Sequence, residues 1–294
     1  MLVISGDETG LVKLVDVDKK KYVSYGTQTR RRGITSIHWV KYGEEACVCR
    51  VDGTVEIWDL SEDDSGAGGL EISHEMSLKP EEAAAASVRG VGCCGRNQIC
   101  ANSLFFTEEG DIMVRGTHPE ATSGGNFKVS APLGAVCASA TRAVFGGREN
   151  DLDLWDLQRG ESVWRAKNVP HDEVRLRVPV WIAGVAYFGA ESDADGYSDV
   201  IVTGTGHRHI RLYDVRVQRQ PVISISTENE FRITRVSAAN DGQRVFVADT
   251  VGGLQAWDVR KQRLVRSVRG LAGSLRDIPQ TSRVDVLVSG GLDL

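Results

Sequence analysis

The chain has 294 residues, of which 41% are hydrophobic and 26% charged, and its formal net charge is −5. These values are typical of a globular protein with a sizeable core, and they exclude a disordered chain. There is no apolar run of membrane-spanning length and no signal peptide, so we expect an intracellular protein without a membrane partner. The negative net charge gives no general indication of nucleic-acid binding.

A short motif recurs along the chain. An apolar strand is followed by a Gly/Asp turn and by a second strand that closes on an apolar or aromatic residue and Asp, as in the Val-Asp-Gly-Thr-Val-Glu-Ile-Trp-Asp of residues 51–59. The closing residues are Asp16, Asp59, Asp156, Asp214 and Asp258. Two of the intervals are 43 and 44 residues, and the 97 residues between positions 59 and 156 are about two periods. A period of roughly 40–45 residues indicates four-stranded propeller blades.

The segments of this motif are predicted to be strands, because they are short, alternate with period two and are rich in Val, Ile, Thr and aromatic residues. In residues 54–58, Val55 and Ile57 are expected on one face and Trp58 on the other, where a neighbouring sheet can cover it. The long interval should contain a degenerate repeat with a strand at 98–101, a turn at 107–110 and a strand at 111–115.

Repetition predicts an all-β, seven-bladed β-propeller that forms a single domain over residues 1–294. The alternative is an open β-solenoid, which usually has a shorter repeat. We expect the last blade to be incomplete, because the chain stops at Leu294. A flexible insert is expected near residues 61–87, with a Gly-rich loop at 63–69 and a helical turn at 81–86. The seven units are predicted to start at Leu2, Ile34, Ser87, Phe127, Val163, Val222 and Leu264.

No catalytic motif is present: there is no nucleophile elbow, no phosphate-binding loop and no His-Glu-x-x-His. The Gly-Thr-Gly-His of residues 204–207 continues into a strand and is interpreted as a hairpin turn. Alternating carboxylates at 193–199 resemble part of a calcium loop but lack the bidentate Glu. The six cysteines lack zinc-ligand spacing and are predicted to be free thiols, mostly buried. We therefore expect no enzyme, cofactor, metal or small-molecule substrate.

One segment departs from the repeat pattern. Residues 163–181 are longer than a blade connection requires, and they combine two prolines and two tryptophans with alternating arginines. A rigid, basic loop with aromatic residues is suited to partner binding, although a long rim loop without a function is an equally good interpretation. The candidate contact residues are Arg165, Lys167, Asn168, Arg175 and Arg177, with His207, Arg208 and His209 as neighbours on the chain's next hairpin.

Four segments carry a resemblance to a known family. They are Gly-Asp-Glu-Thr-Gly at 6–10, Gly-Gly-Arg-Glu-Asn-Asp at 146–151 with Leu-Trp-Asp-Leu at 154–157, the loop at 165–181, and Gly-Leu-Ala-Gly-Ser-Leu-Arg at 270–276 with Ser-Gly-Gly-Leu-Asp at 289–293. The chain resembles the WD-repeat assembly factors of the nucleolar large-subunit (pre-60S) particle. The Arg-Ala-Lys-Asn-Val-Pro run at 165–170 is the most selective part. Arg175 departs from the pattern, because the family usually has an acidic residue there.

The resemblance implies a non-enzymatic WD-repeat scaffold in the nucleus and nucleolus. Such a protein would bind pre-ribosomal large-subunit particles, with their rRNA and assembly factors, would support rRNA processing, and would be released by an AAA ATPase. The alternative is a generic WD-repeat adaptor, such as a ubiquitin ligase substrate receptor or a signalling scaffold. That alternative predicts complexes made of protein alone.

Overall fold

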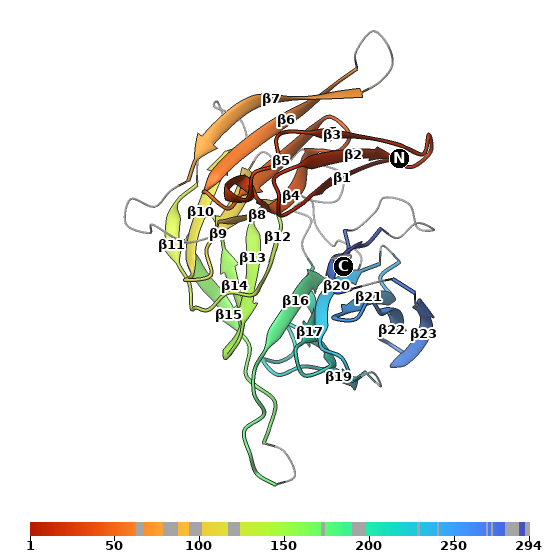
Figure 1. Cartoon of the computed structure of the whole chain (residues 1–294). Coiled ribbons are helices and arrows are strands. Elements are labelled where there is room, and N and C mark those ends of the chain that lie inside the picture. Colours follow the sequence, from red (N-terminus) through yellow and green to blue (C-terminus); the bar gives the residue numbers. More distant parts are fainter. Residues whose placement is uncertain are drawn as a thin grey trace. The chain divides into compact units, whose positions relative to one another are not determined.

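The computed structural model describes residues 1–62, 68–78, 88–93, 102–116, 124–171, 174–189, 198–227, 230–239, 241–268, 270–271, 273–279 and 288–291. The chain divides into two compact units (Figure 1). Unit 1 comprises Met1–Val129 with Ala138–Thr141, and unit 2 comprises Ser130–Cys137 with Arg142–Leu294.

In the described residues of unit 1, three antiparallel sheets follow one another along the chain. The first contains β1 (Leu2–Gly6), β2 (Val12–Asp16) and β3 (Lys21–Tyr25). The second contains β4 (Ile34–Lys41), β5 (Glu45–Arg50), β6 (Thr54–Glu62) and β7 (Gly68–Ser77), and it is preceded by the 3-10 turn η1 (Arg30–Arg32). The third contains β8 (Arg89–Cys93), β9 (Asn102–Phe106), β10 (Asp111–Gly116) and β11 (Asn126–Lys128).

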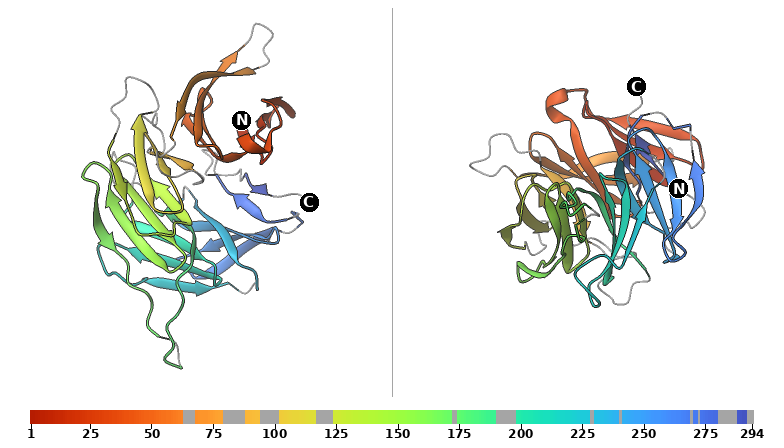
Figure 2. Two further views of the ribbon diagram at one scale, coloured as in Figure 1. Left: turned by 60° about the vertical axis from the view of Figure 1, so that its left-hand side comes forward. Right: turned by 90° about the horizontal axis from the view of Figure 1, so that it is seen from below.

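In the described residues of unit 2 there are three four-stranded sheets and a small two-stranded one, in chain order from green through teal to blue (Figure 2). The first contains β12 (Ala135–Ala138), β13 (Arg142–Gly147), β14 (Asn150–Asp156) and β15 (Glu161–Arg165). The second contains β16 (Ile182–Tyr187), β17 (Val200–Thr205), β18 (His209–Asp214) and β19 (Ile223–Ser226). The third contains β20 (Ile233–Ala238), β21 (Arg244–Asp249), β22 (Leu254–Asp258) and β23 (Arg263–Val268), and the last pairs β24 (Leu275–Asp277) with β25 (Gly290–Gly291).

The repeated motif forms the hairpin that its residues predict. At the β5–β6 turn, Gly53 has φ of 81°, a left-handed conformation that glycine adopts without a steric penalty. The Asp52 carboxylate accepts a hydrogen bond of 2.9 Å from the Thr54 amide, which closes the turn. The all-β class and the propeller type of sheet are therefore confirmed.

Both faces of β6 are buried within unit 1, as its alternation predicts. Val55 and Ile57 pack in one cluster with Phe105 of the third sheet. Trp58 packs in another cluster with Val12, from the first sheet. The same principle holds in unit 2, where the described hydrophobic clusters join residues of one sheet to residues of the next. Apolar burial between successive sheets is thus the main stabilising interaction in each unit.

The predicted starts of the repeats agree only in part with the sheets. Leu2 and Ile34 open β1 and β4. Four later starts fall one strand too early, in or directly before the last strand of the preceding sheet, at Phe127, Val163, Val222 and Leu264. An outermost strand has the same apolar alternation as an innermost one, so periodicity alone does not show where a sheet begins.

The predicted degenerate repeat is the third sheet of unit 1. The turn at 107–110 and the strand at 111–115 are confirmed as the β9–β10 hairpin. The predicted strand at 98–101 and the start at Ser87 lie outside the described residues, as do 63–67, 79–87 and most of 193–199. Within the interval expected as an insert, β6 continues to Glu62 and Gly68–Ser77 form β7.

Three cysteines have described side chains. Cys47 and Cys49 are free, fully buried thiols, and they share one apolar cluster in the second sheet of unit 1. Cys137 is a free, half-buried thiol, and burial raises its pKa to about 11. The prediction of free thiols is confirmed for these three residues.

Candidate functional site

The segment between β15 and β16, residues 166–181, is here called the connecting loop. It extends beyond the ends of these two strands (Figure 1). Its two arms are held together at the base by Asn168, whose Nδ2 donates to the Val178 carbonyl at 2.6 Å. The Asn168 Oδ1 accepts from the Val169 amide at 2.8 Å, and the Asn168 carbonyl accepts from Gln220 Nε2 at 3.2 Å. One side chain thus fixes the base of the loop.

The first arm is the start of the connecting loop, with Lys167, together with Arg165, the last residue of β15. Backbone contacts to Arg219 hold this arm: the Lys167 amide donates to the Arg219 carbonyl at 2.9 Å, and Arg219 Nε donates to the Arg165 carbonyl. The Arg165 side chain donates to Ser130 Oγ at 3.2 Å and is exposed, as is the Lys167 side chain. The backbone is therefore fixed while both cationic side chains face solvent.

The second arm is tied to the β13–β14 turn by Glu149. The Arg177 Nη1 lies 2.7 Å from Glu149 Oε2, and the backbones of Glu149 and Val180 are hydrogen-bonded at 2.8 Å. Between the arms, Arg175 has a left-handed φ of 64° and is exposed. Its neighbours Val174 and Leu176 are 72% and 64% exposed, so the described tip presents apolar and basic side chains in alternation.

The connecting loop ends at a cluster of rings and guanidinium groups, here called the Trp181 cluster (Arg148, Trp181, His207 and Arg232). The guanidinium carbons of Arg148 and Arg232 lie 5.3 and 5.0 Å from the centre of the Trp181 ring, within the range of a cation–π interaction. The His207 ring meets the indole edge-on, with ring centres 5.8 Å apart. Arg148, His207 and Arg232 come from three different connections between strands of unit 2, and Trp181 directly precedes β16.

The β17–β18 turn approaches this indole closely. The Gly206 amide donates to the Trp181 carbonyl at 2.8 Å, and a Cβ added to Gly206 would lie 2.3 Å from Trp181 Cδ2. Any side chain at position 206 would therefore displace the indole. The hairpin interpretation of residues 204–207 is confirmed, because they join β17 to the turn before β18.

The same turn positions the predicted neighbours of the loop. The exposed Arg208 has φ of 65°, and its carbonyl accepts from the Thr227 amide at 2.8 Å. The His209 amide donates to Thr205 Oγ1 at 3.0 Å. Burial lowers the pKa of His209, and the nearby charge of Arg211 lowers it further. We expect a neutral His209 at physiological pH.

Charges from separate elements meet at Asp151, near the start of β14. Burial raises the pKa of its carboxyl, while the charges of Arg177, Arg165 and Arg211 act in the opposite direction. Two of the predicted contact residues, Arg165 and Arg177, are therefore close enough to act on one carboxylate. A charge on each arm of the connecting loop therefore acts on the same carboxyl group at the start of β14.

The structure brings the eight predicted residues together in three groups. Arg165, Lys167 and Asn168 lie at the base of the connecting loop, Arg175 and Arg177 lie on its far arm, and residues 207–209 form the turn beside Trp181. The sequence does not predict Ser130 or Arg232 as site residues. Arg148 and Trp181 occur in the family motifs, but they are not predicted as contact residues either. One feature could have indicated Arg232 as a site residue. It occupies the position directly before the first strand of its sheet, β20, as Trp181 does before β16.

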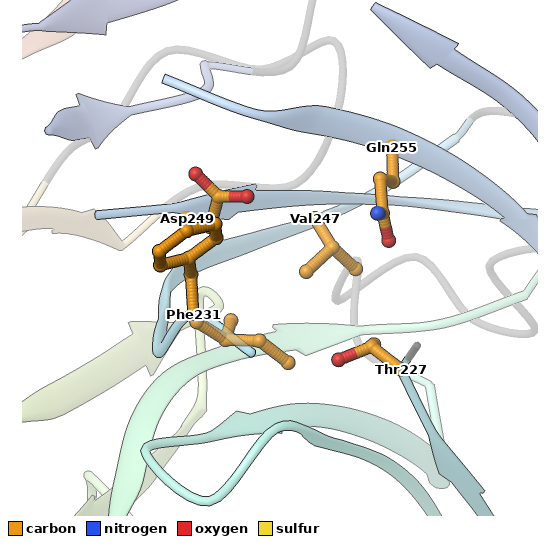
Figure 3. Close-up of a pocket in the computed structure, with 6 residues that line it drawn as sticks. Thr227, Phe231, Val247, Asp249 and Gln255 are labelled. Atoms are coloured by element: carbon orange, nitrogen blue, oxygen red, sulfur yellow. The ribbon is translucent and has the colours of Figure 1, made fainter. Parts of the chain in front are cut away.

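A small hollow lies among β19, β20, β21 and β22 (Figure 3). One of its lining residues, Phe231, directly precedes Arg232 of the Trp181 cluster. It has about 200 Å³ of space, a value that includes open solvent, so the enclosed part is far smaller than the roughly 300–1,000 Å³ of small-molecule sites. Its lining residues are Thr227, Phe231, Ile233, Val247, Asp249 and Gln255. Its size does not suit a substrate or cofactor.

Among the residues that the structure describes, no three His, Cys, Asp or Glu side chains are grouped so that they could hold a metal ion. In the same part of the chain, no helix has the length and apolar character needed to cross a membrane.

Strand-paired sheets that close on Trp-Asp, with connecting loops that display charged side chains, define a WD-repeat protein of the β-propeller class. The chain is 39% identical to WD repeat-containing protein 74 of mouse and of human, over 98% of its own length and 72% of each relative. It therefore belongs to the WD repeat-containing protein 74 family. It is also 22% identical to ribosome biogenesis protein nsa1 of Schizosaccharomyces pombe, over 93% of the chain and 77% of that relative. No protein-family model matches the chain.

Proposed function

We propose that this protein is a non-enzymatic scaffold in large ribosomal subunit biogenesis, binding pre-ribosomal particles in the nucleolus and supporting rRNA processing. Support comes from the family and from relatives that are named ribosome biogenesis proteins. Release by an AAA ATPase and a nuclear location belong to the same proposal. We further infer that β24 and β25 represent a seventh blade, which would complete the predicted number.

The connecting loop is the observation that carries this proposal. Its backbone is fixed by hydrogen bonds from Asn168, Arg219 and Glu149, whereas Arg165 and Lys167 stay exposed. A surface that is ordered before binding loses little conformational entropy when a partner docks. Loops on a rigid scaffold are also where binding residues concentrate. The loop is therefore suited to hold a large particle with several simultaneous contacts.

Charge reversal on the first arm tests the proposal. The double variant Arg165→Glu/Lys167→Glu should lose most of its co-sedimentation with large-subunit precursors, because it places two negative charges where two positive ones now face solvent. The variant would replace the endogenous homologue in a eukaryotic host, and gradient fractions would be probed for the protein and for precursor rRNA.

A matched control is available on the same sheet. Arg159 is 72% exposed and lies in the β14–β15 turn, at the opposite end of β14 from Glu149. Arg159→Glu should leave sedimentation unchanged. If the double variant stays with the precursors at the wild-type level, the loop is not the contact. If the wild-type protein is found only in complexes without RNA, the adaptor alternative replaces the proposal.

A further inference from the structure

The Trp181 cluster carries an inference about what this surface binds. We propose that Arg148 and Arg232, held on the Trp181 indole, bind consecutive phosphate groups of single-stranded RNA. This inference rests on the proposed function, because the RNA would be that of a pre-ribosomal particle. The particle's RNA would then have a defined contact on unit 2. It is tested below with the purified protein, so its outcome does not depend on particle association.

The geometry of the two guanidinium groups suits phosphate binding. Both lie over the same ring, at 5.3 and 5.0 Å from its centre. A guanidinium that stacks on an aromatic ring keeps its N–H edge free, and stacking restricts its side chain before any ligand arrives. Arginine in this arrangement binds phosphate through two parallel hydrogen bonds. Each guanidinium is therefore positioned to contact one phosphate.

Neither guanidinium is paired with a carboxylate among the described residues. Arg177 shows the contrast, since its guanidinium is paired with Glu149 at 2.7 Å. Arg148 and Arg232 are both exposed, and no ion pair is found for either one within the described ranges. Of the acidic side chains nearby, Glu149 is engaged by Arg177, the buried Asp249 accepts hydrogen bonds from the Val251 and Gly253 amides, and Glu230 is exposed two residues before Arg232. Two cationic groups thus remain for an anion outside the chain.

The positive side chains follow a series of connections rather than a single loop. Arg148 lies at the β13–β14 turn, Arg208 at the β17–β18 turn and Arg232 before β20. The His207 ring, beside Arg208, rests against the same indole as the other two. A row of separated charges on successive connections matches a linear polyanion, whose phosphates recur at short and regular intervals.

The chemistry left exposed at the cluster favours RNA over an acidic protein segment. Protein interfaces normally centre on an apolar or aromatic core with a polar rim. Here the one aromatic core residue, Trp181, is already half-buried beneath Arg148, Arg232 and His207. The exposed members of the cluster are its two guanidinium groups, and attraction between such charges and phosphates, with release of counterions, is typical of nucleic-acid binding.

The test is RNA binding by the purified full chain, with a fluorescent single-stranded RNA and anisotropy at several salt concentrations. We expect Arg148→Gln/Arg232→Gln to weaken binding at least about tenfold. Loss of two phosphate contacts should also reduce the slope of log K against log salt by about 1.4, at roughly 0.7 per contact. Arg148→Lys/Arg232→Lys keeps both charges and should retain the salt slope, but it should lose part of the affinity because lysine does not form the stacked fork.

The control variant removes two exposed charges of unit 2 that lie outside the Trp181 cluster. Arg159 follows β14 and Arg216 follows β18, and both are exposed. Arg159→Gln/Arg216→Gln should bind RNA like the wild type. Equal weakening by this control and by the Arg148→Gln/Arg232→Gln variant would show a general charge effect and overturn the proposal, as would an unchanged salt slope in the latter.

A peptide of consecutive glutamates distinguishes the other class of partner. If it competes with RNA at equal charge concentration, the cluster recognises acidic protein and the RNA assignment is wrong. The outcome is separable from the proposed function. Particle association is read with the Arg165→Glu/Lys167→Glu variant, which leaves the Trp181 cluster intact, so either hypothesis can fail while the other stands.

Discussion

Glu56 is a fully buried carboxylate that accepts hydrogen bonds from three side chains of unit 1. Arg50 binds it with two donors, at 2.8 and 2.7 Å, and the Trp58 indole donates at 2.8 Å. Arg32 from the η1 turn also donates to it. Arg50 in turn donates to the carbonyls of Gly10 and Arg32. The buried Arg50–Glu56 pair therefore ties the turn of the first sheet, the η1 turn and the second sheet together.

We expect Glu56→Gln to lower the free energy of unfolding by about 3–5 kcal/mol. Removing one partner leaves the buried Arg50 charge uncompensated, which costs more than the ion pair itself contributes. Urea unfolding followed by tryptophan fluorescence measures the loss. Glu75→Gln is the control, because Glu75 is 56% exposed and 4.0 Å from Arg32, and a surface pair contributes about 1 kcal/mol at most. Similar losses in the two variants would contradict this account.

Glu56 also shows a limit of sequence reasoning at the scale of single residues. The alternation of residues 54–58 correctly predicts that Val55 and Ile57 share one face and that Trp58 occupies the other. It gives no reason to expect a buried Glu between them, since Glu is almost never fully buried unless it is paired. The pairing partners come from residues 32 and 50, on other elements, and short-range patterns do not contain that information.

At the scale of elements, strands and hairpins are more predictable than their grouping into sheets. Residues 107–115 were placed correctly because a Gly-containing turn between two alternating segments specifies a hairpin locally. The starts at Phe127, Val163, Val222 and Leu264 were placed one strand too early. Whether a strand closes one sheet or opens the next depends on which neighbours it hydrogen-bonds, and that is decided by tertiary structure.

The connecting loop is an element that its own residues order. Asn168 joins the two arms through its Nδ2, which donates to the Val178 carbonyl at 2.6 Å, while its Oδ1 accepts from the neighbouring Val169 amide at 2.8 Å within the first arm. Asn168 stays a predicted contact residue. In the structure its side-chain amide is engaged within the loop, so it also positions the loop. The exposed charges of Arg165 and Lys167 depend on this base for their placement.

We expect Asn168→Ala to speed hydrogen–deuterium exchange in residues 174–180 while lowering global stability by only about 1 kcal/mol, the usual net contribution of one or two such hydrogen bonds. The loop would open locally without unfolding the sheets. Exchange followed by mass spectrometry separates the two effects. Asn168→Asp keeps the acceptor for Val169 but not the donor to Val178, so it should protect residues 178–180 no better than Ala does. Unchanged exchange in both variants would show that the arms do not need this side chain.

At the scale of the whole molecule, the sequence predicts the class and leaves the arrangement of the site open. Repeats at a fixed spacing identify a WD-repeat propeller, because each repeat encodes its own hairpins. The candidate surface was found only through the unusual length and charge of one segment. Ser130 and Arg232 lie in connections without unusual length or charge, so that criterion does not select them, and only the packing of successive sheets brings them to the loop.

The response of the whole molecule to acid combines groups from both units. His38 in unit 1 has a solvent-inaccessible Nδ1 and an Nε2 at 2.8 Å from Ser103 Oγ, and burial lowers its pKa to about 4. The Arg216 side chain lowers the pKa of Asp214 in unit 2. Burial acts to raise the pKa of Asp241, but hydrogen bonds from the amides of Arg244 and Gln243 outweigh it, so that pKa is lowered too.

These pKa shifts predict two pH ranges, or windows, in which the free energy of unfolding falls as the pH is lowered. Between pH 6.5 and about 4 the unfolded chain binds a proton at His38 that the folded chain does not, so stability should fall with decreasing pH by about 3 kcal/mol in total. The lowered aspartates keep their stabilising effect above their unfolded pKa and lose it as pH falls below about 4. Urea titrations across this range measure both windows. His38→Gln should flatten the upper window and leave the lower one. A variant that retains the full loss between pH 6.5 and 4 would show that His38 is not its source.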